Sequence, residues 1–179
     1  MPGEKAPLQD AKSFSELYEQ AHLLVFRFIY GLGAGPIEEV EDLTAETFVR
    51  AWKSRRRFQG DKSAATGWLL RIARNLVIDR HRRSRFRGPE QSLEDLPIEV
   101  FEPGIEQQVA EREQMLVLLH LLGELPLDRR EMIVLRYFLE WPVKRIAEHM
   151  GIPENTVSVY LRRTLKNLQR SWPGNLEQD

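Results

Sequence analysis

The feature that most constrains the fold of this chain is the stretch between residues 89 and 103, which interrupts a helical pattern. Prolines stand at positions 89, 97 and 103, and acidic side chains are frequent between them. Proline breaks regular helices, and the acidic residues between the prolines come with few helix signals. The sequence therefore predicts two helical units, residues 13–87 and 105–179, joined by an acidic flexible linker over residues 88–104.

Apolar residues at helical spacing, bounded by glycine and proline, predict an all-α fold of two small helical domains. Residues 1–12 are expected to form a disordered N-terminus, and a capping box of Ser13 and Glu16 is expected to open the first helix. Further helices are predicted over residues 37–57, from Ser63 or Thr66 to the basic tail at Arg87, from Ile105 to Gly123, from Pro126 to Phe138, from Pro142 to Met150, and from residue 154 or 155 to Trp172.

Composition argues against several classes of function. The 179-residue chain has no cysteine, and its four histidines lie far apart in sequence, so no metal site is expected. It has no glycine-rich phosphate loop or nucleophile motif, which argues against an enzyme or a bound cofactor. It also has no apolar run of the length that a signal peptide or a membrane-spanning helix needs. We therefore expect a globular protein that stays in the cytoplasm and has no catalytic residues.

The stretch from Phe48 to Arg87 combines many basic residues with aromatic ones, although the whole chain carries a formal net charge of -1. Aromatic rings in and beside a loop suit stacking against unpaired bases, and basic side chains suit the phosphate backbone. Phe58 and the loop over residues 59–65 are therefore candidates for a base pocket. Trp68, on an apolar helix face, is either a core residue or a stacking platform.

The predicted helix over residues 37–57 has its charges separated along its length. Acidic residues lie in its first half, and the consecutive arginines Arg55, Arg56 and Arg57 lie at its end. Such a separation complements the helix dipole, by roughly 0.3–1 kcal/mol per residue. The run of arginines exceeds what the dipole requires, so part of the charge indicates a binding partner.

Residues 143–168 have the pattern of a helix-turn-helix motif, with the small residue Ala147 in a short helix and Gly151 in the turn. In such motifs the start of the second helix reads base edges in the major groove. An ordinary helical hairpin is the alternative. The candidate base readers are Glu154, Asn155, Thr156, Ser158 and Val159, and the candidate phosphate contacts are Arg162, Arg163 and Lys166.

The chain contains the motifs DLTAETFVRAW at residues 42–52, FQGD at 58–61, WLLRIARNLVID at 68–79, LP at 125–126, RE at 130–131, LRYF at 135–138, IAE at 146–148 and GIPENTV at 151–157. These motifs resemble those of the extracytoplasmic-function, or group 4, sigma factors of bacterial RNA polymerase, which belong to the sigma-70 family. The resemblance covers nearly the whole chain and implies a non-catalytic subunit that directs promoter-specific initiation.

The resemblance implies three binding surfaces, of which the predicted second helix of the helix-turn-helix motif would read the minus-thirty-five duplex. The residues that would bind core polymerase are Asp42, Leu43, Glu46, Thr47, Phe48, Arg50 and Trp52. The residues that would melt the minus-ten element and capture its non-template strand are Phe58, Gln59, Asp61, Lys62, Ala65, Trp68, Arg71, Arg74, Asn75, Asp79 and Arg82.

The partners that the resemblance implies are promoter DNA and core RNA polymerase, through the clamp coiled coil of its β′ subunit and the β flap. It also raises regulation by a sequestering anti-sigma factor. The acidic linker would run towards the RNA exit channel, as a negative strand in a positively lined channel. On composition alone, the same linker is equally well explained as a solvated spacer.

The chain departs from the family pattern at two places. Ala65 and Gly67 precede the tryptophan, where family members often have an aromatic and a hydroxyl residue. In the predicted second helix of the helix-turn-helix motif, Ser158 and Tyr160 replace basic residues that are common in the family. A different minus-ten pocket and fewer phosphate contacts are therefore expected. Two other functions stay open on the residues alone: a dimeric helix-turn-helix regulator that senses a ligand or partner, and a helical adaptor that binds only proteins.

Overall fold

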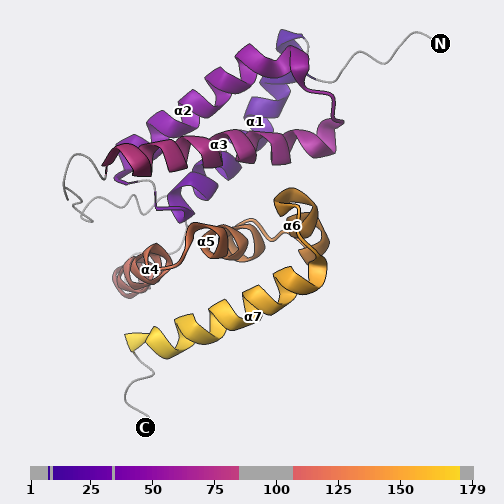
Figure 1. The fold of residues 1–179 in the computed structure, drawn as a ribbon. Coiled ribbons are helices and arrows are strands. Elements are labelled where there is room, and N and C mark those ends of the chain that lie inside the picture. Colours follow the sequence, from indigo (N-terminus) through magenta and orange to yellow (C-terminus); the bar gives the residue numbers. More distant parts are fainter. Residues whose placement is uncertain (1–7, 9, 34, 85–106, 174–179) are drawn as a thin grey trace. The chain divides into compact units, whose positions relative to one another are not determined.

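The computed structural model describes residues 8, 10–33, 35–84 and 107–173. All the regular elements of these residues are helical, which confirms the predicted all-α fold (Figure 1). The chain divides into two compact units, Met1–Tyr30 with Ala34–Ser92 and Gly31–Gly33 with Leu93–Asp179. The predicted linker over residues 88–104 lies outside the described residues, as do residues 1–7 and the basic tail at residues 85–87.

The first unit is built from α1 (Ala11–Gly31), α2 (Ile37–Ser54), the 3-10 turn η1 (Arg55–Arg57) and α3 (Lys62–Ser84). Helices α2 and α3 run alongside each other (Figure 1). Each helix turns an apolar stripe inward, as the helical spacing of the sequence predicts. The core includes the fully buried residues Val25, Phe28, Ile29, Val40, Leu69, Leu70 and Val77.

The N-terminus of α1 differs from the predicted capping box. Asp10 caps the helix, because its carboxylate accepts hydrogen bonds from the Ser13 backbone N–H and from the Ser13 hydroxyl, each at 2.9 Å. These bonds hold the pKa of Asp10 below its ordinary value. Ser13 therefore lies in the first helical turn, and Ala11 and Lys12 are helical although the sequence assigned them to a disordered N-terminus.

Asp61 caps α3 in the same way, since the backbone N–H of Ala64 donates to its Oδ1 at 2.9 Å. The prediction of Ser63 or Thr66 as the cap is therefore wrong, and residues 62–65 belong to the helix rather than to the preceding loop. A carboxylate carries a full negative charge opposite the positive end of the helix dipole, which favours aspartate over a hydroxyl residue at this position.

An ion pair ties the start of α2 to the end of α3. Arg80 Nε donates to Glu39 Oε2 at 2.8 Å, and Arg80 Nη2 contacts the other carboxylate oxygen, so the pairing is bidentate. The two side chains are 33% and 31% exposed. Because residue 39 is near the beginning of one helix and residue 80 near the end of the other, the pair fixes their antiparallel register.

The second unit contains α4 (Gln107–Gly123), α5 (Leu127–Ile133), the π-helical segment η3 (Val134–Phe138), α6 (Val143–Met150) and α7 (Glu154–Ser171). The predicted helix from Pro126 to Phe138 is therefore divided. An α-helical spacing from Met132, Ile133 and Leu135 predicts Tyr137 on the buried side of this helix, but Tyr137 is 49% exposed, whereas Val134 is fully buried. The wider π turn shifts later side chains out of the register that an α-helical spacing predicts.

Helices α6 and α7 form the predicted helix-turn-helix. Gly151 ends α6 in the left-handed region, with φ of 68° and ψ of 33°. Its turn is closed by the Ile152 backbone N–H, which donates to the Ala147 carbonyl at 3.1 Å. Buried Ile146 and Ala147 of α6 belong to the same core as Val157 of α7.

Helix α6 is also joined to α5 by a buried polar pair. His149 Nε2 lies 3.3 Å from Glu131 Oε1, and the two side chains are 4% and 2% exposed. The Trp141 and His149 rings meet edge to face at a centroid distance of 5.4 Å. Since a buried polar group costs stability unless it is hydrogen-bonded, this pair favours one placement of α6 on α5.

The turn between α6 and α7 generates a prediction about glycine. A Cβ at Gly151 meets nothing within 4 Å, so Gly151→Ala creates no clash, but a left-handed backbone is unfavourable for alanine. We expect Gly151→Ala to lower the free energy of unfolding of this unit by about 1 kcal/mol. Urea denaturation measures the loss, and hydrogen exchange of the α6 and α7 amides assigns it to this unit.

The matched control is Gly123→Ala at the end of α4. A Cβ there also meets nothing within 4 Å, and the residue does not have a left-handed φ. Alanine is a better helix former than glycine, so stability should be unchanged or slightly raised. Equal losses in the two variants would contradict the assignment of the cost to backbone conformation.

The Glu39–Arg80 pair generates a second prediction. In a double-mutant cycle with Glu39→Ala and Arg80→Ala, we expect a coupling free energy of about 1 kcal/mol, because the pair is bidentate and partly shielded. The control cycle uses Glu46 and Arg50, which are joined by one bond within α2 and are 44% and 45% exposed. Its coupling should be about 0.3–0.5 kcal/mol. The same value in both cycles would contradict the proposed role of Arg80 in joining the two helices.

Candidate functional site

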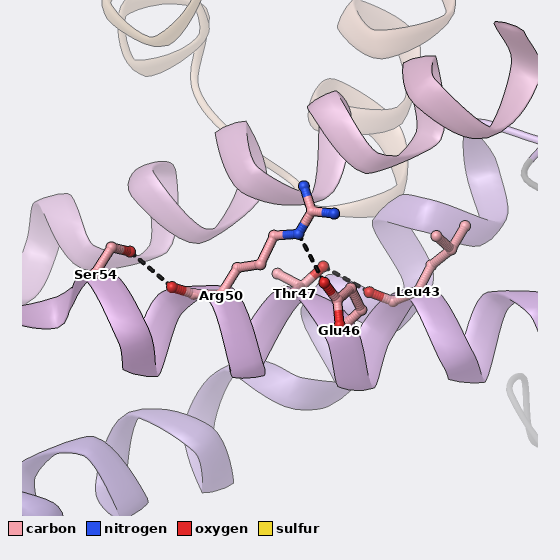
Figure 2. A network of polar contacts seen from close by, with 5 residues as sticks. All are labelled: Leu43, Glu46, Thr47, Arg50 and Ser54. Atoms are coloured by element: carbon pink, nitrogen blue, oxygen red, sulfur yellow. Dashed lines mark hydrogen bonds and ion pairs between the residues drawn. The ribbon is translucent and has the colours of Figure 1, made fainter.

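Helix α2 presents the residues predicted to bind core polymerase. Figure 2 shows Arg50 Nε donating to Glu46 Oε1 at 2.8 Å, while the Thr47 hydroxyl donates to the Leu43 carbonyl at 2.7 Å. Asp42 and Arg50 are exposed, and Leu43 and Glu46 are partly exposed. The acidic Asp42 and Glu46 and the basic Arg50 thus share an accessible face of the helix.

Other predicted residues of α2 face the interior of the unit. Thr47 is fully buried and Phe48 is 5% exposed, whereas Trp52 is 36% exposed. The hydroxyl of buried Thr47 donates its hydrogen bond to the helix backbone, so this hydroxyl has no donor left for a binding partner. These buried residues support the α2 surface from below, and Trp52 belongs to its rim.

Sequence reasoning missed the contribution of α1 to this region. The Phe14 ring meets Trp52 at 5.1 Å between centroids, and the Tyr18 ring meets Phe48 at 4.8 Å, both edge to face. His22 stacks on Tyr18 at 5.3 Å. The spacing of residues 14, 18 and 22, one helical turn apart, was the available signal for a continuous aromatic row.

The three arginines after α2 have different surroundings. The Arg55 guanidinium lies 3.4 Å from the Trp52 ring centroid, and its Nη1 donates to the Trp52 carbonyl at 2.6 Å. Arg56 and Arg57 are exposed. Arg55 therefore covers Trp52 and ends the helix, while the charges of its two neighbours are directed to solvent.

Phe58, in the loop between α2 and α3, forms an aromatic pair with Trp68 of α3. The Phe58 and Trp68 rings lie 4.8 Å apart with an interplanar angle of 30°, and both side chains are half-buried. A Cβ at Gly60 would approach the Phe58 ring to 2.6 Å, so glycine allows the loop to fold against this ring. Trp68 is thus neither a fully buried core residue nor a fully exposed stacking platform, because its ring is packed on one side and accessible on the other.

The remaining predicted minus-ten residues of the loop have different surroundings. Gln59 is exposed, Asp61 is exposed and uses its carboxylate as the α3 cap, and Ala65 is fully buried. Lys62 is the first residue of α3, and the position of its side chain lies outside the described structure. Ala65 therefore forms the floor beneath the loop, not a part of its outer surface.

Helix α3 carries a strip of polar and basic side chains along one flank. Arg71, Asn75 and Arg82 are exposed, and Arg74 and Asp79 are half-buried. Arg82 Nη2 lies 3.5 Å from Asp79 Oδ1, an ion pair that is open to solvent. Because these positions recur at helical spacing, the strip runs from the aromatic pair towards the end of the helix.

Helix α7 places the predicted DNA-reading residues on its accessible side. Thr156 and Val159 are half-buried, and the other predicted positions are exposed. The opposite side buries Val157, Leu161 and Leu168. The exposed residues of the predicted set are Glu154, Asn155, Ser158, Arg162, Arg163 and Lys166.

Two arginine contacts near the helix-turn-helix were not predicted. The Arg129 guanidinium lies 2.9 Å from the Tyr160 ring centroid, and the Arg145 guanidinium lies 3.9 Å from the Trp141 ring centroid. Burial lowers the pKa of Arg145 from its ordinary value. Arg129 and Tyr160 are far apart in the sequence, so no local spacing could reveal their contact.

Two kinds of feature are absent from the described ranges. No group of three or more histidine, aspartate or glutamate side chains there is arranged to hold a metal ion. Of the helices in those ranges, none is both long and apolar enough to cross a membrane.

The models of two protein-family regions match this chain. Sigma-70 region 2 matches residues 17–87, and Sigma-70 region 4 matches residues 115–168. The first covers most of α1, α2, the loop and α3, and the second covers the end of α4, α5, η3, α6 and most of α7. The first match falls in the first unit apart from residues 31–33, and the second falls in the second unit.

Two curated relatives support the same assignment. The chain is 33% identical over 170 residues to the ECF RNA polymerase sigma factor BldN of Streptomyces coelicolor, covering 95% of this chain and 64% of BldN. It is 33% identical over 141 residues to the RNA polymerase sigma factor CnrH of Cupriavidus metallidurans, covering 74% of this chain and 73% of CnrH.

The structure is similar to the sigma factor RpoE of Bartonella quintana, which was solved in complex with the anti-sigma factor NepR. The TM-score is 0.70 with 21% identity, over 90% of this chain and 97% of that one. This likeness concerns the fold. The two region matches and the relationships to BldN and CnrH show that the chain belongs to the extracytoplasmic-function sigma factors of the sigma-70 family.

Proposed function

We propose that this sigma factor divides promoter recognition between its two units. The first binds core RNA polymerase and captures the minus-ten strand, and the second reads the minus-thirty-five duplex. The observation that carries this proposal is the presence of region 2 and region 4 in one chain, each with an accessible polar surface. A stand-alone helix-turn-helix regulator would have no use for the aromatic pair and the basic strip of the first unit.

The α2 surface is the proposed contact for the clamp coiled coil of the β′ subunit. Asp42, Glu46 and Arg50 present charges of both signs on one helix face, and Trp52 adds an apolar rim. Mixed charges favour a particular partner and register over non-specific binding to nucleic acid. The β flap is the proposed partner of the second unit.

The Phe58–Trp68 pair and the α3 strip are the proposed site for the melted minus-ten strand. A flipped base has two exposed π faces, and aromatic stacking contributes about 1–3 kcal/mol per base. Arg71, Asn75 and Arg82 lie on the adjoining helix, where they can bind the phosphates of a single strand. The loop would thus select the base while the strip holds the backbone.

We further propose that the protein acts in the cytoplasm, without catalytic activity of its own, and that an anti-sigma factor regulates it. The support for regulation is that the similar RpoE was solved with such an inhibitor. Catalysis of RNA synthesis would remain with the polymerase, and this chain would contribute only binding free energy.

The deciding experiment adds the purified chain to core RNA polymerase and fragmented genomic DNA of the same organism, followed by sequencing of transcript 5′ ends. We expect starts at a limited set of sites that share two sequence elements, because both units contribute to selection. Core polymerase alone is the control. DNA binding without new start sites would favour the stand-alone regulator, and neither activity would favour a protein-binding adaptor.

The role of α7 predicts a separate effect on salt dependence. Arg163→Ala should weaken binding to the selected duplex and reduce the slope of log affinity against log salt by about 0.9, the value for one phosphate contact. Arg170→Ala, an exposed arginine in the last turn of the same helix, is the matched control and should leave the slope unchanged.

Base readers should behave differently from phosphate contacts. Asn155→Ala or Ser158→Ala should alter the preferred sequence, with about 1–3 kcal/mol at stake for a good bidentate contact, and should leave the salt slope as it is. Comparison of affinities across single-base variants of the duplex measures this preference. An unchanged slope in Arg163→Ala would remove Arg163 from the phosphate-binding set.

A further inference from the structure

The recognition helix α7 is held by a contact outside its apolar core. The guanidinium of Arg129, in the first turn of α5, lies 2.9 Å from the centroid of the Tyr160 ring. Arg129 Nη1 is buried and lacks a hydrogen-bond partner among the described atoms. An arginine over an aromatic face is attracted more strongly when it is desolvated. The ring is therefore the specific partner of this guanidinium.

The position of Tyr160 on α7 explains why this contact matters for DNA. Tyr160 is half-buried and lies between the buried residues and the accessible side of the helix. Thr156 precedes it by about one turn and Arg163 follows it by about one turn, so the three share a flank. A contact that holds the Tyr160 ring thus restricts the rotation of α7 about its own axis. It thereby also restricts the positions of Thr156 and Arg163.

The other end of the contact is firmly anchored. The backbone N–H of Arg129 donates to the Pro126 carbonyl at 2.9 Å. The next residue, Arg130, is 8% exposed, and its Nη2 donates to the Leu125 carbonyl at 3.2 Å. The turn that leads into α5 is therefore tied to the helix at two points, which makes Arg129 a fixed support.

We propose that Arg129 is a positioning residue for minus-thirty-five recognition: through Tyr160 it sets the rotation of α7 and hence the placement of Thr156 and Arg163 in the groove. This inference rests on the proposed function of α7. Tyr160 occupies a position where basic residues are common in the family, so this chain uses the position to orient the helix. The positive charge near this position comes from Arg129 of α5, and it contacts the Tyr160 ring.

The test measures the affinity of the full chain for a duplex from the mapped promoters and for a scrambled duplex, at several salt concentrations. Arg129→Gln and Tyr160→Leu should each reduce the ratio of the two affinities by about two- to tenfold, the size of one cation–π contact. Tyr160→Phe keeps the ring and should keep the ratio. The double variant Arg129→Gln/Tyr160→Leu should lose no more than either single variant, and all salt slopes should stay unchanged.

Three results would overturn the inference. A slope reduced by about 0.9 in Arg129→Gln but not in Tyr160→Leu would make Arg129 a direct phosphate contact. Additive losses would mean that the two residues act separately, and an unchanged ratio would mean that the contact has no role in reading. Circular dichroism checks folding, and if Arg129→Gln does not fold, Tyr160→Phe against Tyr160→Leu tests the same contact.

Failure of the inference is distinguishable from failure of the proposed function. If the wild-type chain does not prefer the selected duplex, the proposed function of α7 is wrong. If the wild type prefers it and the variants keep the full preference, only the role of Arg129 is wrong.

Discussion

The binding surfaces of both units depend on how each helix divides between a buried apolar stripe and an accessible polar face. In α7 the buried stripe includes Val157, Leu161 and Leu168, and its burial leaves the other side of the helix accessible for the proposed contact with DNA. In α2 the buried Thr47 and Phe48 play the same part. A helix that was apolar on all sides could not expose such a surface, and one that was polar on all sides would not be held in place.

Polar interactions then fix what burial alone leaves adjustable. An apolar stripe tolerates small rotations and shifts of a helix, because dispersion contacts have little directional preference. The Glu39–Arg80 pair and the buried Glu131–His149 pair are directional, and each joins two helices at a defined point. The surfaces therefore owe their position to a few specific contacts laid over a broad apolar core.

The division into helices was largely predictable from the sequence, because amphipathic spacing and helix-breaking residues give strong local signals. The long stripe of α7 and the turn at Gly151 illustrate this, as does the exposed set of α7 residues. Helix starts were less predictable: serine and aspartate are both good caps, so Ser13 competed with Asp10 and Ser63 with Asp61. Only the hydrogen bonds of the folded chain separate these alternatives.

Other features were hidden because they depend on contacts between distant residues or on rare backbone geometry. The π-helical segment moved Tyr137 to the surface, which an α-helical spacing could not anticipate. Burial of Thr47 and Ala65 was missed because small residues suit either environment. The contact of Arg129 with Tyr160 joins α5 to α7, and no spacing rule links residues so far apart.

The charge balance of the chain has a physical role in promoter selection. Its 26 basic and 27 acidic residues give a formal net charge of -1, although the surfaces proposed to bind nucleic acid are basic. Phosphate contacts act on any DNA sequence, so a strongly basic sigma factor would be held at non-specific sites. The acidic residues elsewhere in the chain offset the basic surfaces of α3 and α7 and so limit that loss. Selection then depends on the geometry with which the loop and α7 meet a promoter, and this geometry is what the directional contacts inside each unit preserve.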